Sequence, residues 1–142
     1  MNRREYRMAF IKWSTNLSVN VAEIDSQHQH LVNFINDLSE AMKEGKGKDV
    51  AGEIISGMIL YAQTHFATEE KYFDKFGYPE TLMHKEEHNA FVKKVTEFKN
   101  DFDKGKQLLS IPLLSFLRDW LVNHINVSDM KYSGFFNENG LR

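Results

Sequence analysis

Imidazole and carboxylate side chains recur in this sequence at spacings that suit metal coordination. His65 and Glu69 are four residues apart, as are His84 and His88. On a helix, each such pair projects from one face on adjacent turns and can bind one metal ion. The chain has no cysteine, so disulfides, thiolate catalysis and thiolate metal sites are excluded. The available ligand chemistry is therefore that of imidazole nitrogen and of oxygen.

His124 and Asp129 form a third pair with a different spacing. They are five residues apart, which separates them by about 140° around a regular helix. For both side chains to reach one centre, the helix must end, bulge or unwind between them. The sequence therefore predicts an irregular backbone near Val127 and Ser128.

The elements that must position these residues are four amphipathic helices. Apolar residues recur at alternating steps of three and four, which is the period of a helix with one buried face. The breaks between the segments are short, and short connections favour antiparallel neighbours. The sequence predicts one all-α domain over residues 1–142, an up-down-up-down four-helix bundle with an N-terminal arm at 1–20, helices at 21–44, 48–76, 79–104 and 111–128, and a C-terminal tail at 129–142.

Residues near the expected helix ends agree with these boundaries. Asn20 and Glu23 have the spacing of a capping box at the start of the first helix. Pro79 suits the first turn of the third helix. Gly77 and Gly105 lie where the second and third helices are expected to end.

Each predicted helix carries histidine in the apolar stripe that faces the core. A single inward histidine is normally a hydrogen-bonded structural residue, but each buried polar group without a partner costs several kcal/mol. A shared site explains the whole set better than separate structural roles do. His30 lies about 200° around the helix from the inward position two residues earlier and is expected to be exposed. The inward set comprises His28, His65, Glu69, His84, His88, His124 and Asp129.

This set is too large for one tetrahedral zinc ion, which takes four ligands. A pair of octahedral ions fits better, because five imidazoles, two bridging carboxylates and one bridging oxygen would leave one position open. A pair of ions with a single vacancy inside an apolar bundle suits one small exogenous ligand. The ligand mixture suits iron, with manganese and zinc as alternatives on ligand type alone.

The inward residues belong to four short motifs, namely Ile24-Asp25-Ser26-Gln27-His28, His65-Phe66-Ala67-Thr68-Glu69, His84-x-x-x-His88 and His124-Ile125-x-x-x-Asp129. These motifs resemble those of the hemerythrin family, in particular its single-domain bacterial members, and the resemblance covers about residues 13–132. The resemblance implies a non-haem di-iron centre with a bridging oxo or hydroxo group that binds dioxygen reversibly. It implies that His84, His88 and His124 bind one iron. It also implies that His28 and His65 bind the iron with the open position, and that Glu69 and Asp129 bridge.

A pocket for a diatomic ligand needs apolar walls that exclude water and protons. Leu121 is the first candidate, because it lies one turn before His124 and because the resemblance implies a leucine there. The other candidates are equally well explained as ordinary core residues. The full set of expected pocket residues is Leu121, Ile125, Trp120, Ile24, Leu31 and Phe66.

Two other metal sites are possible on motif grounds. The run from His84 to His88 matches the His-x-x-Glu-His pattern of zinc proteases, with Glu87 as the general base. That interpretation leaves the remaining inward histidines and carboxylates unexplained, so Glu87 is expected on the solvated side. Ferritin-like di-iron oxidases also hold two metals in a four-helix bundle, but their repeated Glu-x-x-His motif is absent here.

The functional hypotheses are an oxygen carrier, store or deliverer, an oxygen or redox sensor, and a di-iron enzyme with peroxidase, oxidase or nitric oxide activity. A histidine-rich site favours holding oxygen over activating it, so we expect binding rather than catalysis. Sensors of this kind are expected to be fused to signalling domains, for which 142 residues leave no room. The expected partners are dioxygen and an oxygen-consuming enzyme that receives it.

Composition excludes several other classes of function. The chain has 18 Lys and Arg against 20 Asp and Glu, a net charge of −2, so it has no basic footprint for nucleic acid. No segment approaches the roughly 18 consecutive apolar residues of a membrane span. Arg3 and Arg4 resemble the start of an export signal, but Lys12 interrupts the following apolar run. We expect a cytoplasmic protein, compatible with a monomer, for which Met8 is an alternative start.

Overall fold

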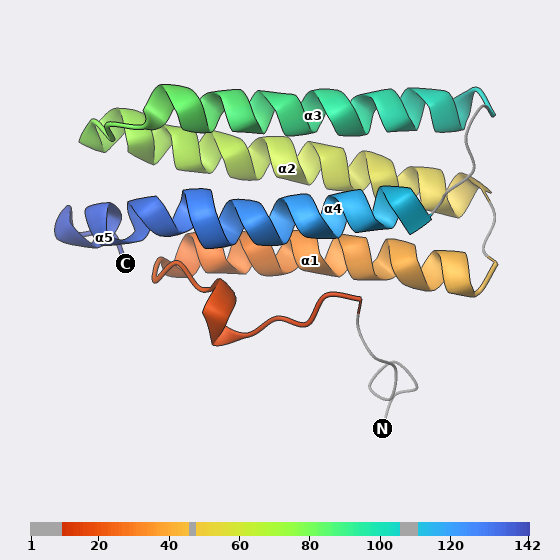
Figure 1. Ribbon diagram of the computed structural model, residues 1–142, viewed down its shortest axis with the longest axis horizontal. Coiled ribbons are helices and arrows are strands. Elements are labelled where there is room, and N and C mark those ends of the chain that lie inside the picture. The colour runs from red at the N-terminus through yellow and green to blue at the C-terminus, as the bar shows by residue number, and fades with distance from the viewer. Residues whose placement is uncertain (1–9, 46–47, 106–110) are drawn as a thin grey trace.

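The computed structural model describes residues 10–45, 48–105 and 111–142, and these residues form helices and no β-strand. Four long helices lie side by side (Figure 1). Helix α1 packs against α2 and α4, and α2 packs against α3. The predicted all-α four-helix bundle is confirmed. The helices are α1 (Ala22–Lys43), α2 (Lys48–Phe76), α3 (Thr81–Asp103) and α4 (Ile111–Asn123).

The start of α1 differs from the predicted capping box. Asn20 has a φ of 60°, in the left-handed region, and α1 has no side-chain cap. The carboxylate of Asp25 stabilises this end instead, because it accepts hydrogen bonds from the Val19 backbone N–H at 2.8 Å and the Ser18 hydroxyl at 2.6 Å. The capping box with Glu23 is therefore wrong, and a carboxylate inside the first turn secures the incoming chain.

The connection between α2 and α3 is a tight turn. Gly77 follows the last residue of α2 and has a φ of 68°, which a residue without a Cβ adopts at little cost. Pro79 lies in the turn, and α3 begins at Thr81 rather than at residue 79. The Thr81 hydroxyl donates to the carbonyl of Tyr78 at 2.6 Å, which closes the turn. Gly105, with a φ of 71°, follows the end of α3 as expected.

The predicted tail after residue 129 is wrong, because most of it is helical. A π-helical segment, η3 (His124–Asp129), leads into α5 (Met130–Glu138), and in Figure 1 the two continue the line of α4. Tyr132 and Phe136 are fully buried, and their rings lie 5.5 and 5.6 Å from that of Phe73 on α2. The wider π turn rotates the buried face of the helix, so the apolar residues after it no longer follow the spacing of three and four residues that predicts a regular α-helix.

The arm before α1 is attached to the bundle at both ends. The Ile11 backbone N–H donates to Asn36 Oδ1 at 2.7 Å, and Asn36 Nδ2 donates back to the Ile11 carbonyl at 2.9 Å. A short 3₁₀ turn, η2 (Thr15–Leu17), follows. The Ser133 hydroxyl of α5 then donates to the Val19 carbonyl at 2.6 Å. The arm therefore joins α1 to α5, while the expected alternative start at Met8 lies outside the described residues.

The described part of the chain contains no helix that is long and apolar enough to cross a membrane.

Candidate metal centre

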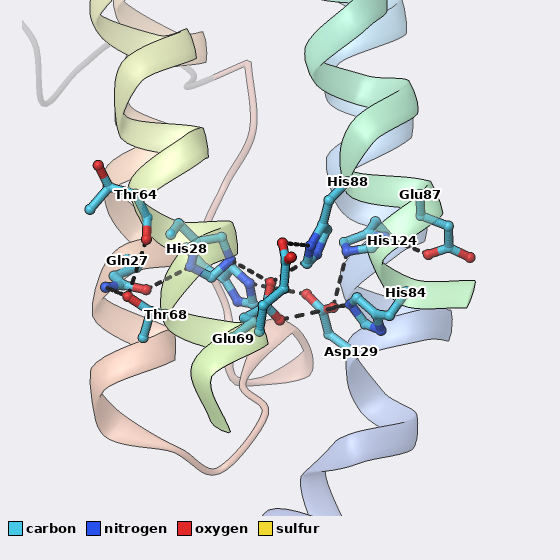
Figure 2. Close-up of polar contacts among 12 residues, drawn as sticks. Gln27, His28, Thr64, Thr68, Glu69, His84, Glu87, His88, His124 and Asp129 are labelled. Atoms are coloured by element: carbon cyan, nitrogen blue, oxygen red, sulfur yellow. Dashed lines mark hydrogen bonds and ion pairs between the residues drawn. The ribbon is translucent and has the colours of Figure 1, made fainter. Parts of the chain in front are cut away.

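The inward histidines and carboxylates of α1, α2, α3 and η3 meet in one buried region. Figure 2 shows side chains from α1, α2, α3 and the segment after α4 pointing toward one another. Their exposed fractions lie between 0 and 6%. The residues brought together are His28, His65, Glu69, His84, His88, His124 and Asp129.

These side chains form two groups that could each hold a metal ion. Within each group, one ligand atom from every residue lies within 4.8 Å of the others. The first group comprises Glu69, His84, His88 and His124. The second comprises His28, His65, Glu69 and Asp129. The groups share Glu69, so they are halves of one centre rather than separate sites.

The two carboxylates lie between the groups and contact both. Asp129 Oδ1 is 2.9 Å from His84 Nε2 and 3.1 Å from His124 Nε2. Its other oxygen, Oδ2, is 3.1 Å from His28 Nε2 on the opposite side. In Figure 2 Asp129 lies between the histidines of α1 and those of α3, as does Glu69. The arrangement suits a carboxylate whose two oxygens serve two different ions.

Glu69 makes the corresponding contacts from α2. Its Oε1 is 3.1 Å from His65 Nε2 and 3.2 Å from His88 Nε2. Its Oε2 is 3.9 Å from His84 Nε2. Because His65 belongs to one group and His88 to the other, Glu69 also spans both halves of the centre.

The position of Asp129 depends on the π-helical segment η3. Its hydrogen bonds run from residue i to i+5, so residues five apart lie on nearly the same face. This geometry brings Asp129 within 3.1 Å of the ring of His124, which a regular helix would not do. The predicted irregular backbone near Val127 and Ser128 is confirmed.

The buried polar atoms of the centre lack ordinary hydrogen-bond partners. Among the described residues, eleven buried side-chain nitrogen and oxygen atoms have no such partner, and nine of them belong to the centre. An unsatisfied buried polar atom costs about 1–3 kcal/mol. A cluster of lone pairs aimed at common points, made of imidazole and carboxylate donors, therefore fits bound metal cations.

The electrostatics of the centre show how strongly its groups interact. Burial raises the pKa of Glu69, but contact with His65 and His88 outweighs burial, so the pKa is below its usual value. Burial lowers the pKa of His65. Burial also lowers the pKa of His124, but the neighbouring Asp129 outweighs burial and raises it to about 9. Positive charge beside the two carboxylates therefore stabilises them, and either protons on the imidazoles or metal cations can provide that charge.

Two imidazoles of the centre, one on α3 and one on η3, have carboxyl groups behind them. His88 Nδ1 lies 3.1 Å from Glu70 Oε2, and His124 Nδ1 lies 3.0 Å from Glu87 Oε2. Glu87 lies at the solvated side as expected, with its side chain 37% exposed, but its Oε2 is buried against His124. One side chain can be partly exposed and still contact a neighbouring helix, and a count along α3 alone does not reveal that contact.

An amide lies behind His65. Its Nδ1 is 2.7 Å from Gln27 Oε1, and Gln27 Nε2 donates to the Thr68 hydroxyl at 3.2 Å. The helical period of the sequence does not identify Gln27 or Glu70 as partners of the centre. Both directly adjoin a centre residue in the sequence, at positions 28 and 69, and that adjacency is the only signal that could have pointed to them.

The expected pocket residues fall into two sets. Phe66 stacks on His88 with ring centroids 3.9 Å apart, and Trp120 stacks on His124 at 4.4 Å. These two aromatic rings therefore cover imidazoles of the first group. The aliphatic members of the expected pocket are all buried in the same core, namely Ile24, Leu31, Leu121 and Ile125.

His30 lies outside the centre, as predicted. It is exposed on α1, and its ring stacks on Tyr61 at 4.9 Å.

Comparisons with known proteins agree with this geometry. The family model "Hemerythrin HHE cation binding domain" matches residues 19–135. A bacteriohemerythrin of Stenotrophomonas maltophilia is 33% identical over 126 residues, covering 89% of this chain and 81% of the relative. One from Methylococcus capsulatus is 31% identical and covers 88% and 95%. A crystal structure of wild-type hemerythrin superposes with a TM-score of 0.84 at 30% identity, covering 89% of this chain and 97% of the other.

Proposed function

Because the chain belongs to the hemerythrin family, we propose that it binds dioxygen reversibly at a pair of iron ions joined by an oxo or hydroxo bridge. In this proposal it acts as an oxygen carrier, store or deliverer, and an oxygen-consuming enzyme receives the oxygen. The observation that carries the proposal is the pair of buried, metal-competent groups that share Glu69.

The two groups receive different roles in the proposal. His84, His88 and His124 hold one ion, and His28 and His65 hold the other. Glu69 and Asp129 bridge the ions, which is supported by their contacts with imidazoles on both sides. Since the second ion has one imidazole fewer, it keeps a position for an external ligand.

Bound ferrous iron supplies the electrons that dioxygen binding requires. The chain contributes orientation and shielding. Glu69 and Asp129 would hold both ions, and the buried aliphatic side chains of Ile24, Leu31, Leu121 and Ile125 would exclude water from the centre. An imidazole-rich centre with one vacancy favours holding a ligand over activating it.

The proposed reversibility is tested by an oxygen cycle on the iron-loaded protein. The protein is reduced without air, exposed to oxygen and then purged, while the visible spectrum is recorded. A carrier is expected to develop a new absorption band that disappears on purging, over repeated cycles. Irreversible conversion to a ferric form with turnover of peroxide would replace the carrier role with that of an enzyme.

Substituting Leu121 tests the proposed pocket. Leu121→Ala is expected to raise the rate of autoxidation of the oxygen-bound protein severalfold, because a smaller side chain admits water to the open position. The rate is followed by the decay of the oxygen-dependent band. Leu60→Ala serves as the control, because Leu60 is 66% exposed and is not one of the buried core residues. An autoxidation rate equal to that of the parent protein would remove Leu121 from the pocket.

A further inference from the structure

The hydrogen-bond partners behind the imidazoles differ between the two groups of the centre. In the first group, His88 and His124 each direct Nδ1 at a glutamate oxygen, at 3.1 and 3.0 Å. In the second group, His65 directs Nδ1 at an amide oxygen at 2.7 Å. The Nδ1 of His28 is buried, and no hydrogen-bond partner for it lies within the part of the chain that the structure describes. Among the described residues, the carboxyl partners of Nδ1 atoms in the centre therefore lie behind the first group.

The amide behind His65 is held in a defined orientation. Gln27 Nε2 donates to the Thr68 hydroxyl at 3.2 Å, and that hydroxyl donates to the Thr64 carbonyl at 3.2 Å. Figure 2 shows Gln27, Thr64 and Thr68 together on the side of the centre away from α3. Because Nε2 of Gln27 donates to Thr68, Oε1 of the same amide faces His65. The neutral partner is built into this half of the centre.

The partners behind the other group are carboxyl groups, which can carry a negative charge where an amide cannot. The side chains of Glu70 and Glu87 are 30% and 37% exposed, so each glutamate lies at the edge of the bundle rather than in its core. A surface hollow adjoins the pair of Glu87 and His124 and is lined by Trp120, Asn123 and Val127 as well. Each glutamate is thus a carboxyl acceptor that reaches a buried imidazole from the protein surface.

An ionised acceptor changes what the imidazole can do. A histidine that donates Nδ1–H to a carboxylate is fixed in the tautomer whose Nε2 lone pair faces the metal, and its basicity rises. A hydrogen bond to an amide fixes the same tautomer but transfers less charge, because charge-assisted bonds are about twice as strong as neutral ones. The ion held by His88 and His124 therefore sees the stronger ligands.

We propose that Glu70 and Glu87 are positioning residues that make the His84, His88 and His124 group the tighter metal site. This group then fills first as metal is added and releases its ion last. The His28 and His65 group, backed by the neutral Gln27, fills second. The inference rests on the proposed two-metal centre, and it assigns the difference in affinity to charge behind the ligands rather than to the ligands alone.

The test is a titration of the metal-free protein with Zn²⁺ against a competing chromophoric chelator. The parent protein is expected to bind two ions in unequal steps. Glu70→Gln and Glu87→Gln, which keep the shape of each side chain, are each expected to weaken the tighter step by about 10 to 100-fold and leave the weaker step unchanged. Gln27→Glu is expected to tighten the weaker step, a gain that a purely structural role for residue 27 would not produce.

Glu86→Gln is the matched control. Glu86 adjoins Glu87 on α3, is exposed, and carries the same charge change in the substitution. It is expected to leave both steps unchanged. An equal effect of Glu86→Gln and Glu87→Gln would assign the effect to net charge and overturn the positioning role.

The remaining outcomes separate this inference from the function on which it rests. Two steps that are unaffected by Glu70→Gln and Glu87→Gln would overturn the inference and leave the two-metal centre intact. Binding of a single ion, or of none, would overturn the two-metal centre itself. Repeating the titration with Co²⁺ gives a second readout, because its visible absorption bands report the ligands of the ion bound in each step.

Discussion

Replacing His65 by alanine is expected to reduce the metal content from two ions per chain to about one. The substitution removes one of the two imidazoles of the second group and leaves His28 with the shared carboxylates. The first group keeps its three imidazoles and its glutamate partners. The loss is therefore expected to be confined to one ion. Metal analysis of the iron-loaded protein after gel filtration measures it.

His30→Ala is the matched control for this substitution. It also removes an imidazole, here from α1, but His30 is exposed and its ring stacks on Tyr61 rather than facing the centre. It is expected to retain both ions. Equal metal loss in His30→Ala and His65→Ala would contradict the assignment of the inward histidines to the centre. Whether a histidine faces inward or outward on its helix would then make no difference to metal binding.

Phe136→Ala is expected to lower the free energy of unfolding by about 3–5 kcal/mol, the usual cost of removing a fully buried phenylalanine. Phe136 is 0% exposed, and its ring lies 4.5 Å from that of Tyr132 and 5.6 Å from that of Phe73. Its removal leaves a cavity where α5 packs on α2. Chemical denaturation of the metal-loaded protein, followed by circular dichroism, measures the change.

The neighbouring Phe135 provides the comparison. It is only partly buried, with its nearest aromatic contact to Tyr78 at 5.2 Å. Phe135→Ala is expected to cost clearly less than Phe136→Ala. If both substitutions lowered the free energy of unfolding by the same small amount, α5 would not pack into the core as the structure describes. The helix that follows Asp129 would then not help to hold that residue in place.

Much of the centre could be predicted from the sequence because its residues follow the helical period. The spacing of four between His65 and Glu69, and between His84 and His88, requires only a helix to place each pair on one face. The irregular backbone after His124 followed from the same geometry, since a spacing of five does not fit a regular helix. These predictions use one helix at a time.

The features that the sequence analysis missed depend on neighbouring helices or on a change of helical phase. Glu87 reaches His124 only because α3 lies beside the segment that follows α4. Helix α5 was mistaken for a tail because the π turn shifts the apolar stripe that contains Tyr132. The start of α1 was misjudged because Asp25 secures it in place of Asn20. Contacts between elements are not encoded in the period of either element.

The proposed function requires that the chain hold two iron ions in the two groups that share Glu69. Anomalous diffraction from crystals of the iron-loaded protein, recorded at the iron absorption edge, tests it most directly. We expect two peaks, one among His84, His88 and His124 and one beside His28 and His65, with Glu69 and Asp129 between them. A single peak, or a zinc signal at one position without iron, would contradict it.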